Sequence, residues 1–366
     1  MCDGGGSCLF AVSDPAAVSE TATAEAFRAR LRAEEPVLAL APMQAVTDHG
    51  FIHLLRRYGG ADVCFAEYFR VTADSKLDRE ILRCATANET GRPVVLQMIG
   101  NDVGHLVRTA KELQKHPVAG IDLNLGCPAP RVFNKCAGGG LLRDLARIDR
   151  ILGALREAIT EVPFTVKTRI GVEEASLAEF DALLTVYARH EPDLLTVHGR
   201  TVKEMYRTAV HYDFIAHAVQ VMRCPVLANG NVDSAETALR VLAETGARGL
   251  MLGRGAIRNP WLFEQIRAAA AGQEVVEPTG REVLGYLEAL YETVTDDGYT
   301  EEERVHRVKK HLNFIGLGVE PRSEFLDRMR RTRSREALFE VCAVFLEHDR
   351  PMRLVAPSVE EVNLLS

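Results

Sequence analysis

The chain has few aromatic residues and no long hydrophobic run. Phe, Trp and Tyr make up 6% of its 366 residues, and only one of them is tryptophan. No apolar stretch approaches the roughly 20 residues that a membrane-spanning helix needs. Residues 1–7 also lack the basic start and apolar core of a secretory signal. These absences predict a cytoplasmic protein with no membrane partner.

The eight cysteines are scattered and form no CxxC pair. Paired Cys or His ligands at short spacing are typical of zinc sites, and conserved cysteine spacings are typical of small disulfide-linked domains. The spacing of Cys127 and Cys136 fits no common metal site. The sequence therefore predicts reduced thiols, a reducing compartment and no metal centre.

Acidic residues outnumber basic ones overall, but the basic residues are concentrated in one region. The chain has 44 Lys and Arg against 51 Asp and Glu, a net charge of −7, which argues mildly against nucleic acid as a partner. Residues 304–335 reverse this balance, with ten basic and three acidic side chains. Such a cluster is commonly only a solvated face, but one this uneven is also the pattern expected for binding phosphate backbones.

Short apolar stretches alternate with helical periods from residue 36 onward. The expected strands cover residues 37–40, 63–66, 94–98, 121–124, 164–169, 194–198, 225–229 and 249–252. Helical patterns follow them at 48–58, 78–84, 103–115, 145–159, 177–189, 214–222, 234–244 and 260–271. Eight such units indicate parallel pairing and predict an α/β fold, the TIM (β/α)8 barrel. A doubly wound sheet is the alternative, but no GxGxxG sequence opens the first helix.

The two ends of the chain differ from this pattern. Residues 1–34 are rich in small and polar residues with one possible helix at 24–32, and we expect a mobile tail. The barrel is expected over residues 35–275. Beyond it only helical periods remain, at 282–295, 301–315, 323–331 and 336–347. We therefore expect a small all-α domain over residues 278–366, whose second helix carries Arg304, Arg307 and Lys310.

One stretch places a thiol at the end of an expected strand. Cys127 lies between Gly126 and Pro128, directly after the strand expected at 121–124. Glycine permits backbone shapes that other residues avoid, and proline fixes its own φ, so the cysteine stands on a rigid loop. A free cysteine is ordinarily an inert small hydrophobic residue. This context favours a functional thiol instead.

Polar residues also end the other expected strands. In a TIM barrel these ends meet at one mouth, where the active site lies. Lys167 is unusual because it interrupts an apolar run, and a buried ammonium is costly without a partner. Gln97 and His198 have structural alternatives as satisfied core side chains. The remaining candidates at these strand ends are Pro42, Met43, Gln44, Asn124, Arg169 and Arg200.

The loops after the last two expected strands predict a phosphate site. Asn229-Gly230-Asn231 and Gly253-Arg254-Gly255 follow the seventh and eighth strands, where barrels usually bind phosphate. Glycine lets backbone N–H groups approach an anion, and Arg254 adds positive charge. No protein side chain here transfers hydride, so a reduction would need a cofactor. In the absence of a Rossmann sequence, FMN suits this site better than a dinucleotide.

The motifs, taken together and in order, resemble those of the bacterial tRNA-dihydrouridine synthases, flavoenzymes that reduce uridines in tRNA. The similar sequences are LAPM at 40–43, QMIG at 97–100, NLGCP at 124–128, VKTRIG at 166–171, TVHGRT at 196–201, NG at 229–230 and GRGA at 253–256. The resemblance covers about residues 39–262 and continues more faintly at 307–312. It implies a TIM barrel, FMN as cofactor, NADPH as reductant and tRNA as substrate.

The resemblance also implies a role for each matching residue. Cys127 would be the proton donor to the reduced uracil. The expected flavin contacts are Pro42, Met43, Gln44, Gln97, Lys167 and His198, and the expected FMN phosphate contacts are Asn229, Gly230, Asn231, Gly253 and Arg254. The expected substrate contacts are Asn124, Arg169 and Arg200 in the barrel and Arg304, Arg307 and Lys310 in the helical domain.

Two other functions are compatible with these residues. One is an FMN-dependent barrel oxidoreductase that acts on a small molecule of the dihydroorotate or enoate type. The other is a catalytically inactive RNA-binding relative. For the tRNA-reducing enzyme we expect a monomer.

Overall fold

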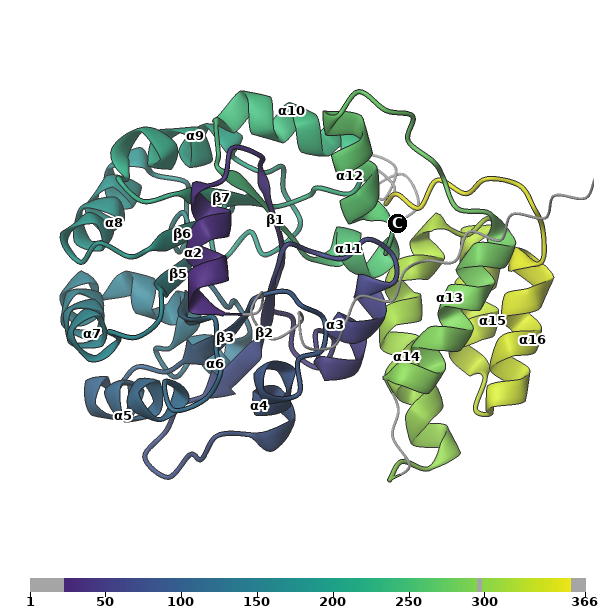
Figure 1. Cartoon of the computed structure of the whole chain (residues 1–366), viewed down its shortest axis with the longest axis horizontal. Coiled ribbons are helices and arrows are strands. Elements are labelled where there is room, and N and C mark those ends of the chain that lie inside the picture. Colours follow the sequence, from purple (N-terminus) through teal and green to yellow (C-terminus); the bar gives the residue numbers. More distant parts are fainter. Residues whose placement is uncertain (1–22, 295–297, 357–366) are drawn as a thin grey trace, which may run out of the picture.

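The computed structural model describes residues 23–294 and 298–356 and contains a closed barrel of eight parallel strands beside a group of helices (Figure 1). The strands are β1 (Val37–Leu40), β2 (Val63–Arg70), β3 (Val94–Ile99), β4 (Gly120–Leu125), β5 (Phe164–Arg169), β6 (Leu194–His198), β7 (Val226–Asn229) and β8 (Gly249–Leu252). Each pairs with the next, and β8 closes the barrel on β1. The predicted TIM barrel followed by helices is confirmed, and the doubly wound sheet is excluded.

Helices surround the barrel in the expected alternation. They are α3 (His49–Arg56), α4 (Arg79–Thr86), α5 (Val103–Leu113), α7 (Leu145–Ala158), α8 (Leu177–Arg189), α9 (Tyr212–Val221), α10 (Ala235–Thr245) and α12 (Leu262–Ala270). Asp or Ser side chains cap most of them by accepting an N–H of the first turn, as Asp48 does for α3 and Ser234 for α10. Short helical turns are inserted at the mouth: α6 (Pro130–Phe133), η1 (Gly138–Arg143) and α11 (Arg254–Arg258).

The amino-terminal helix α2 (Ala24–Arg32) lies across one end of the barrel (Figure 1). Its Phe27 is fully buried against the apolar interior of the barrel, and its ring meets that of Phe65 edge-on at 6.4 Å. Thr23 caps the helix. The helix expected at 24–32 is therefore present, but it is part of the barrel and not of the tail predicted for residues 1–34. Residues 1–22 of that predicted tail lie outside the described residues.

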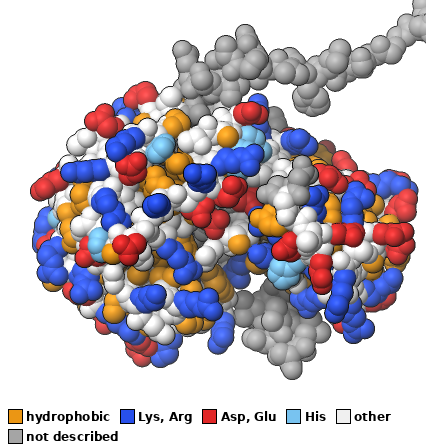
Figure 2. Space-filling view, turned by 90° about the horizontal axis from the view of Figure 1, so that it is seen from below, with side chains coloured by type: hydrophobic (Ala, Val, Ile, Leu, Met, Phe, Trp, Pro, Cys, Tyr) orange, Lys and Arg blue, Asp and Glu red, His pale blue; other side chains and the backbone are white. Residues whose placement is uncertain are grey.

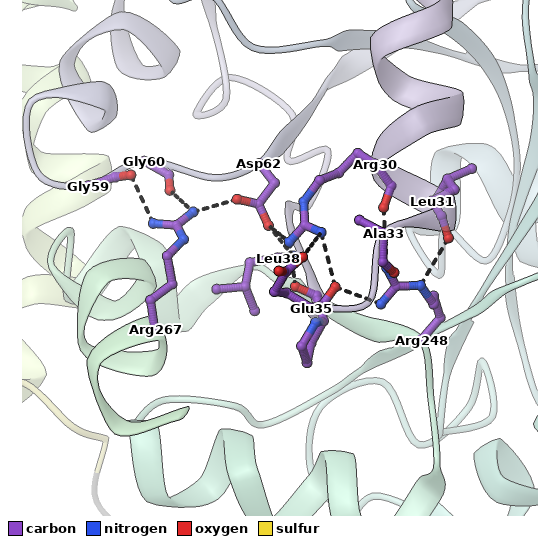
Figure 3. A network of polar contacts seen from close by, with 11 residues as sticks. Arg30, Leu31, Ala33, Glu35, Leu38, Gly59, Gly60, Asp62, Arg248 and Arg267 are labelled. Atoms are coloured by element: carbon purple, nitrogen blue, oxygen red, sulfur yellow. Dashed lines mark hydrogen bonds and ion pairs between the residues drawn. The ribbon is translucent and has the colours of Figure 1, made fainter. Parts of the chain in front are cut away.

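A polar network holds α2 in place (Figure 3). Arg248, which precedes β8, donates to four carbonyl groups at the end of α2 and in the segment after it. Arg30 of α2 contacts Asp62 at 2.9 Å, and the other oxygen of Asp62 accepts from Arg267 of α12 at 2.7 Å. Because Asp62 is buried, these pairs tie three distant segments together at this end of the barrel.

The helical domain contains α13 (Gly280–Thr293), α14 (Glu301–Ile315), η2 (Gly316–Gly318), α15 (Arg322–Arg331) and α16 (Arg335–Leu346). Helix α14 lies against the barrel. Arg307 forms an ion pair with Asp48 at 3.0 Å, and the buried His311 ring packs on Phe51 at 5.2 Å. Arg258 of α11 also donates to a carbonyl of α14 at 3.2 Å. These contacts place α14 next to the segments that follow β1 and β8, near the mouth of the barrel. Within residues 23–294 and 298–356, no helix is both long and apolar enough for a membrane span.

Candidate active site

Cys127 lies at the mouth, on the tight loop that follows β4. Its backbone N–H and that of Gly126 both donate to Asn124 Oδ1, at 2.9 and 3.0 Å, and its carbonyl accepts from Gly139 at 3.1 Å. Gly138 has φ of +54°, and a Cβ there would come within 3.0 Å of the Cβ of Cys127. The loop is therefore fixed by its own hydrogen bonds and by close packing, as the sequence predicted.

Tyr68 of β2 contacts this thiol, and the sequence did not single it out. It belongs to a small buried cluster against which Cys127 packs, and its hydroxyl donates to Gln44 Oε1 at 2.9 Å. Burial, followed by the neighbouring Cys127 thiol, raises the pKa of Tyr68 to about 12, so it remains a neutral phenol. The pairing of β2 with β3 has a register irregularity between Phe65 and Tyr68, and no local sequence pattern signals it.

Predicted residues from β3 and β4 lie inside the barrel and contact each other. Gln97 is fully buried and accepts a hydrogen bond from Asn124 at 2.7 Å. Gln97 also donates to Asp122, a buried carboxylate, at 2.6 Å. Thr165 of β5 donates to the second oxygen of Asp122 at 2.5 Å. Asp122 is thus a further member of this group, and its place within an apolar strand was the only sign of it in the sequence.

Lys167 points from β5 into the same interior. Its Nζ donates to Asn229 Oδ1 at 3.0 Å, and Asn229 Nδ2 donates to the carbonyl of Met251 at 2.7 Å, which fixes the orientation of the amide. Burial, together with the nearby Arg169, lowers the pKa of Lys167 to about 8, while Asp122 and Cys127 act in the opposite direction. Lys167 is the register partner of Asn124, whose side chain holds the Cys127 loop, so its ammonium lies near that loop. The ammonium can lose its proton near neutral pH.

Cations converge on the mouth around His198. Burial and the charges of Arg169, Lys167, Arg200 and Arg254 hold the pKa of His198 well below its usual range, so it is a neutral imidazole. Burial, with Arg254 and Arg169, also lowers the pKa of Arg200 to about 10. Glu204 acts in the opposite direction on the pKa of Arg200, but four cations still surround one neutral imidazole. The mouth is therefore electrostatically suited to an anionic ligand.

Two of these arginines are held by backbone carbonyl groups. Arg169 is 1% exposed and donates to the carbonyls of Gly126, Thr201 and Met205 at 2.9, 2.6 and 3.0 Å. Arg200 is fully buried and donates to the carbonyl of Thr208. Both side chains therefore brace the loops of the mouth, and Arg169 braces the loop of Cys127 directly.

An exposed aromatic ring lies over the same cations. Tyr206 is 46% exposed, and its ring lies 4.4 Å from the Arg254 guanidinium and 5.4 Å from that of Arg169. Its ring centre is 5.9 Å from that of His198. Tyr206 lies in an irregular segment after β6, where no periodic pattern could mark it as part of the site.

The loops predicted to hold phosphate converge beside these residues. Gly230 has φ of +136°, which favours glycine, and Arg254 Nη2 donates to Asn231 Oδ1 at 3.4 Å. A Cβ at Gly253 would lie 3.5 Å from Met43 Sδ, so the loops after β1 and β8 also meet. Pro42 and Met43 are partly buried there, while Gln44 is exposed.

The three candidates on α14 have different surroundings. Arg307 contacts the barrel through Asp48 and also donates to the carbonyl of Val294, while Arg304 donates to the carbonyl of Tyr299. Both therefore contribute to the structure of the domain and its attachment to the barrel. Lys310 lies on α14 and is partly exposed. The structure does not bring these three together with Cys127.

Another basic group occupies a groove between α14 and α15 that we call the α14–α15 groove. Its volume is about 400 Å³, and it is lined by Glu302, Val305, His306, Lys309, Arg330, Arg331, Thr332 and Arg333. On the face drawn in Figure 2, Lys and Arg are interspersed with Asp and Glu over both the barrel and the helical domain. Burial, followed by Arg333, lowers the pKa of Lys309, so the positive charges in the groove affect each other. The groove is thus a local cluster of basic side chains.

No metal centre is apparent in the part of the chain that the structure describes. No group of three His, Cys, Asp or Glu side chains there could hold a metal ion. The described cysteines, which exclude Cys2 and Cys8, are all free thiols.

Comparison with known proteins connects this site to a family. The dihydrouridine synthase family model matches residues 39–347. The chain is 30% identical over 321 residues to a tRNA-dihydrouridine(16) synthase of Neisseria meningitidis serogroup A, covering 85% of this chain and 95% of the relative. It is 34% identical to the enzyme of the same name from Ralstonia nicotianae, over 80% of this chain and 91% of that relative. It is also 34% identical to tRNA-dihydrouridine synthase B of Pseudomonas aeruginosa, over 82% of this chain and 90% of that relative.

A solved structure supports the fold alone. Histamine dehydrogenase from Rhizobium sp. 4-9 superposes with a TM-score of 0.51 at 13% identity, over 69% of this chain and 48% of that chain. The family match spans most of the chain, and the curated relatives are matched along nearly their whole length. The protein therefore belongs to the dihydrouridine synthase family of flavin-dependent oxidoreductases.

Proposed function

We propose that this protein is a tRNA-dihydrouridine synthase that reduces the carbon–carbon double bond of uracil at specific uridines, with FMN as cofactor and NADPH as reductant. The observation that carries the proposal is that Asn124, which holds the Cys127 loop, and Lys167 are register partners on the adjacent strands β4 and β5, at the end of the barrel where Cys127 lies. Membership of the family and the names of the curated relatives support the substrate.

The residues of the mouth fit a flavin phosphate. The convergent cations and the glycines after β7 and β8 suit the phosphate. Lys167 and Gln97 point into the interior with hydrogen-bonding capacity to spare, and the buried Thr196 hydroxyl has no partner among the described residues. A buried hydroxyl without a partner is costly, and a bound polar ring can satisfy it. Bound FMN supplies the hydride, which no side chain here can provide.

Cys127 is the proposed general acid. Hydride addition to the β-carbon of the uracil enone would leave an enolate, whose α-carbon then requires a proton. The thiol of Cys127 delivers that proton. The neutral phenol of Tyr68 lies beside it, and its hydroxyl, which donates to Gln44 Oε1 in this structure, would have to turn from Gln44 to donate to the resulting thiolate. Lys167 and the arginines of the mouth favour the anionic form of the substrate electrostatically.

The α14–α15 groove is the proposed contact with the tRNA backbone. A uridine must leave the folded RNA to reach the barrel mouth, which costs a few kcal/mol. Contacts between phosphates and basic side chains offset this cost. His306, Lys309, Arg330 and Arg333 line the groove. Lys309 also donates to the carbonyls of Arg330 and Thr332, and Arg330 donates to Asn313, just as Arg304 and Arg307 make contacts within the protein. Because the groove gathers several cations around one opening, it is the main candidate for phosphate contacts, and Lys310 follows Lys309 on α14.

Nucleoside mass spectrometry tests the proposal. We expect the purified protein, supplied with FMN, NADPH and unmodified tRNA, to convert uridine to dihydrouridine at a defined position. No dihydrouridine, despite a bound flavin that NADPH reduces, would contradict it. Reduction of a free enone or dihydroorotate-type substrate in place of tRNA would indicate the small-molecule alternative, and failure to bind any flavin would indicate the inactive RNA-binding alternative.

A further inference from the structure

A carboxylate lies inside the barrel below the mouth, and the proposed reaction assigns it no role. Asp122 is 0% exposed. A buried carboxylate is costly unless it is hydrogen bonded, and Asp122 accepts two short hydrogen bonds, from the Thr165 hydroxyl at 2.5 Å and from Gln97 Nε2 at 2.6 Å. Burial raises the pKa of Asp122 to about 6, and both donors and Lys167 act against that rise. At pH 8 the group is therefore ionised.

A chain of hydrogen bonds leads from this carboxylate to Cys127. Gln97 donates its amide nitrogen to Asp122, and its amide oxygen accepts from Asn124 Nδ2 at 2.7 Å. The oxygen of Asn124 then accepts the backbone N–H groups of Gly126 and Cys127. Both amides thus have their nitrogen toward the carboxylate and their oxygen toward the loop.

The direction of this chain is the same when followed from either end, because the carboxylate can only accept hydrogen bonds and the two backbone N–H groups of the loop can only donate them. An amide can be turned over so that nitrogen and oxygen exchange places, but an ionised carboxylate can only accept hydrogen bonds. With Asp122 in place, Gln97 must present its amide nitrogen to Asp122 and its amide oxygen to Asn124. Asn124 must then present its nitrogen to Gln97, which leaves its oxygen for the loop. Reversal of either amide would place two donors or two acceptors face to face in a buried site.

We propose that Asp122 is a positioning residue: its carboxylate fixes, through Gln97 and Asn124, the conformation of the loop that presents the Cys127 thiol. The importance of that conformation for catalysis rests on the proposed function. The hydrogen-bond chain itself does not, and it can be tested in the protein without flavin or tRNA.

Moving the carboxylate along the chain tests the proposal. Asn124→Asp alone puts an acceptor-only group at each end of Gln97, so one of them faces the amide oxygen. Combined with Asp122→Asn, the same change lets Gln97 turn over. Its nitrogen then donates to the carboxylate at position 124, and its oxygen accepts from the amide at position 122. The carboxylate at position 124 still accepts the two N–H groups of the loop.

Thermal unfolding of the flavin-free protein at pH 8 gives the first measurement. We expect the double variant to melt at a higher temperature than Asn124→Asp alone, although Asp122→Asn alone lowers the melting temperature. Independent residues would instead give additive losses, and a double variant that melts below both single variants would overturn the proposal. If Asn124→Asp fails to fold, folding of the double variant supports the proposal, and its failure while Asp122→Asn folds overturns it.

The second measurement is the rate at which iodoacetamide alkylates Cys127, followed by peptide mass spectrometry. Cys136, which is exposed nearby, serves as the internal reference. We expect Asn124→Asp to shift the ratio of the two rates and the double variant to restore it. The control is Asp62→Asn, which removes the buried carboxylate of the α2 network; it lowers the melting temperature and leaves the ratio unchanged. A ratio that the double variant does not restore contradicts the proposal, whether or not the protein reduces tRNA.

Discussion

At the residue scale, the site depends on charged groups removed from water inside a barrel. Lys167 donates to Asn229, and burial, followed by repulsion from Arg169, lowers its pKa to about 8. The imidazole of His198 is neutral for the same reasons. The mouth therefore has a lysine whose charge changes close to the pH of the cell beside a histidine that stays uncharged.

Lys167→Ala tests the role of that ammonium. A hydrogen bond from a charged donor contributes about 1.5–3 kcal/mol, so we expect FMN to bind roughly 10- to 100-fold more weakly. Because the side chain is protonated below its pKa of about 8, FMN affinity of the wild type should fall as the pH rises through that value, and affinity of the variant should not. Flavin fluorescence titrations measure both effects.

The exposed Lys203 provides the control, since its side chain pairs with Glu173 on the surface. Lys203→Ala should bind FMN as the wild type does and keep its pH dependence. Unchanged FMN affinity in Lys167→Ala would contradict the assignment of Lys167 to the flavin.

At the scale of elements, one helix closes the barrel opposite the site. Phe27 of α2 fills the end of the interior, and the Arg30–Asp62–Arg267 and Arg248 contacts hold the helix there (Figure 3). A barrel interior must be packed to be stable, so this helix supports the positions of the strands that carry the site.

Phe27→Ala should therefore destabilise the whole barrel. Truncation of a fully buried phenylalanine costs about 3–5 kcal/mol of unfolding free energy, which thermal or urea unfolding measures. Glu25→Ala on the exposed side of α2 is the control, with an expected change within about 0.5 kcal/mol because its ion pairs are on the surface. Equal stability of Phe27→Ala and Glu25→Ala would show that α2 does not close the barrel.

The sequence predicted the helices and strands better than the contacts between side chains from distant segments. Regular alternation of short apolar runs and helical periods was enough to predict the barrel, because that pattern is local. The role of α2 was missed because it depends on Arg248, more than 200 residues away in the chain. Asp122 and Tyr68 were missed for a related reason: the side of a strand that faces the interior follows from closure of the barrel and from a bulge, neither of which is written in one segment.

At the scale of the whole molecule, the helical domain is attached beside the mouth. Arg307 and His311 of α14 contact Asp48 and Phe51, which follow β1. The positive charge predicted for the helical domain is thus divided, with part of it used for attachment and part lining the α14–α15 groove. A net acidic protein can bind RNA in this way through a local basic surface.

Reversing the charge of two groove residues tests that surface. Arg330→Glu with Arg333→Glu should weaken tRNA binding at least about tenfold and reduce the slope of log Kd against log salt concentration by roughly 1.5 to 2, because two phosphate contacts are lost. Arg223→Glu, at an exposed position on the barrel, is the control. Equal tRNA affinity and equal salt dependence in the wild type, the double variant and Arg223→Glu would contradict tRNA binding in the α14–α15 groove.

The most direct test of the account is a single turnover of the reduced flavoprotein with tRNA, followed by flavin reoxidation without oxygen. A general acid contributes about 10²- to 10⁴-fold to the rate, so Cys127→Ala should keep its flavin but reoxidise at least about 100-fold more slowly. Cys136→Ala, the exposed cysteine nearby, should react like the wild type. Reoxidation of Cys127→Ala by tRNA at the wild-type rate would contradict the claim that this thiol protonates the reduced uracil.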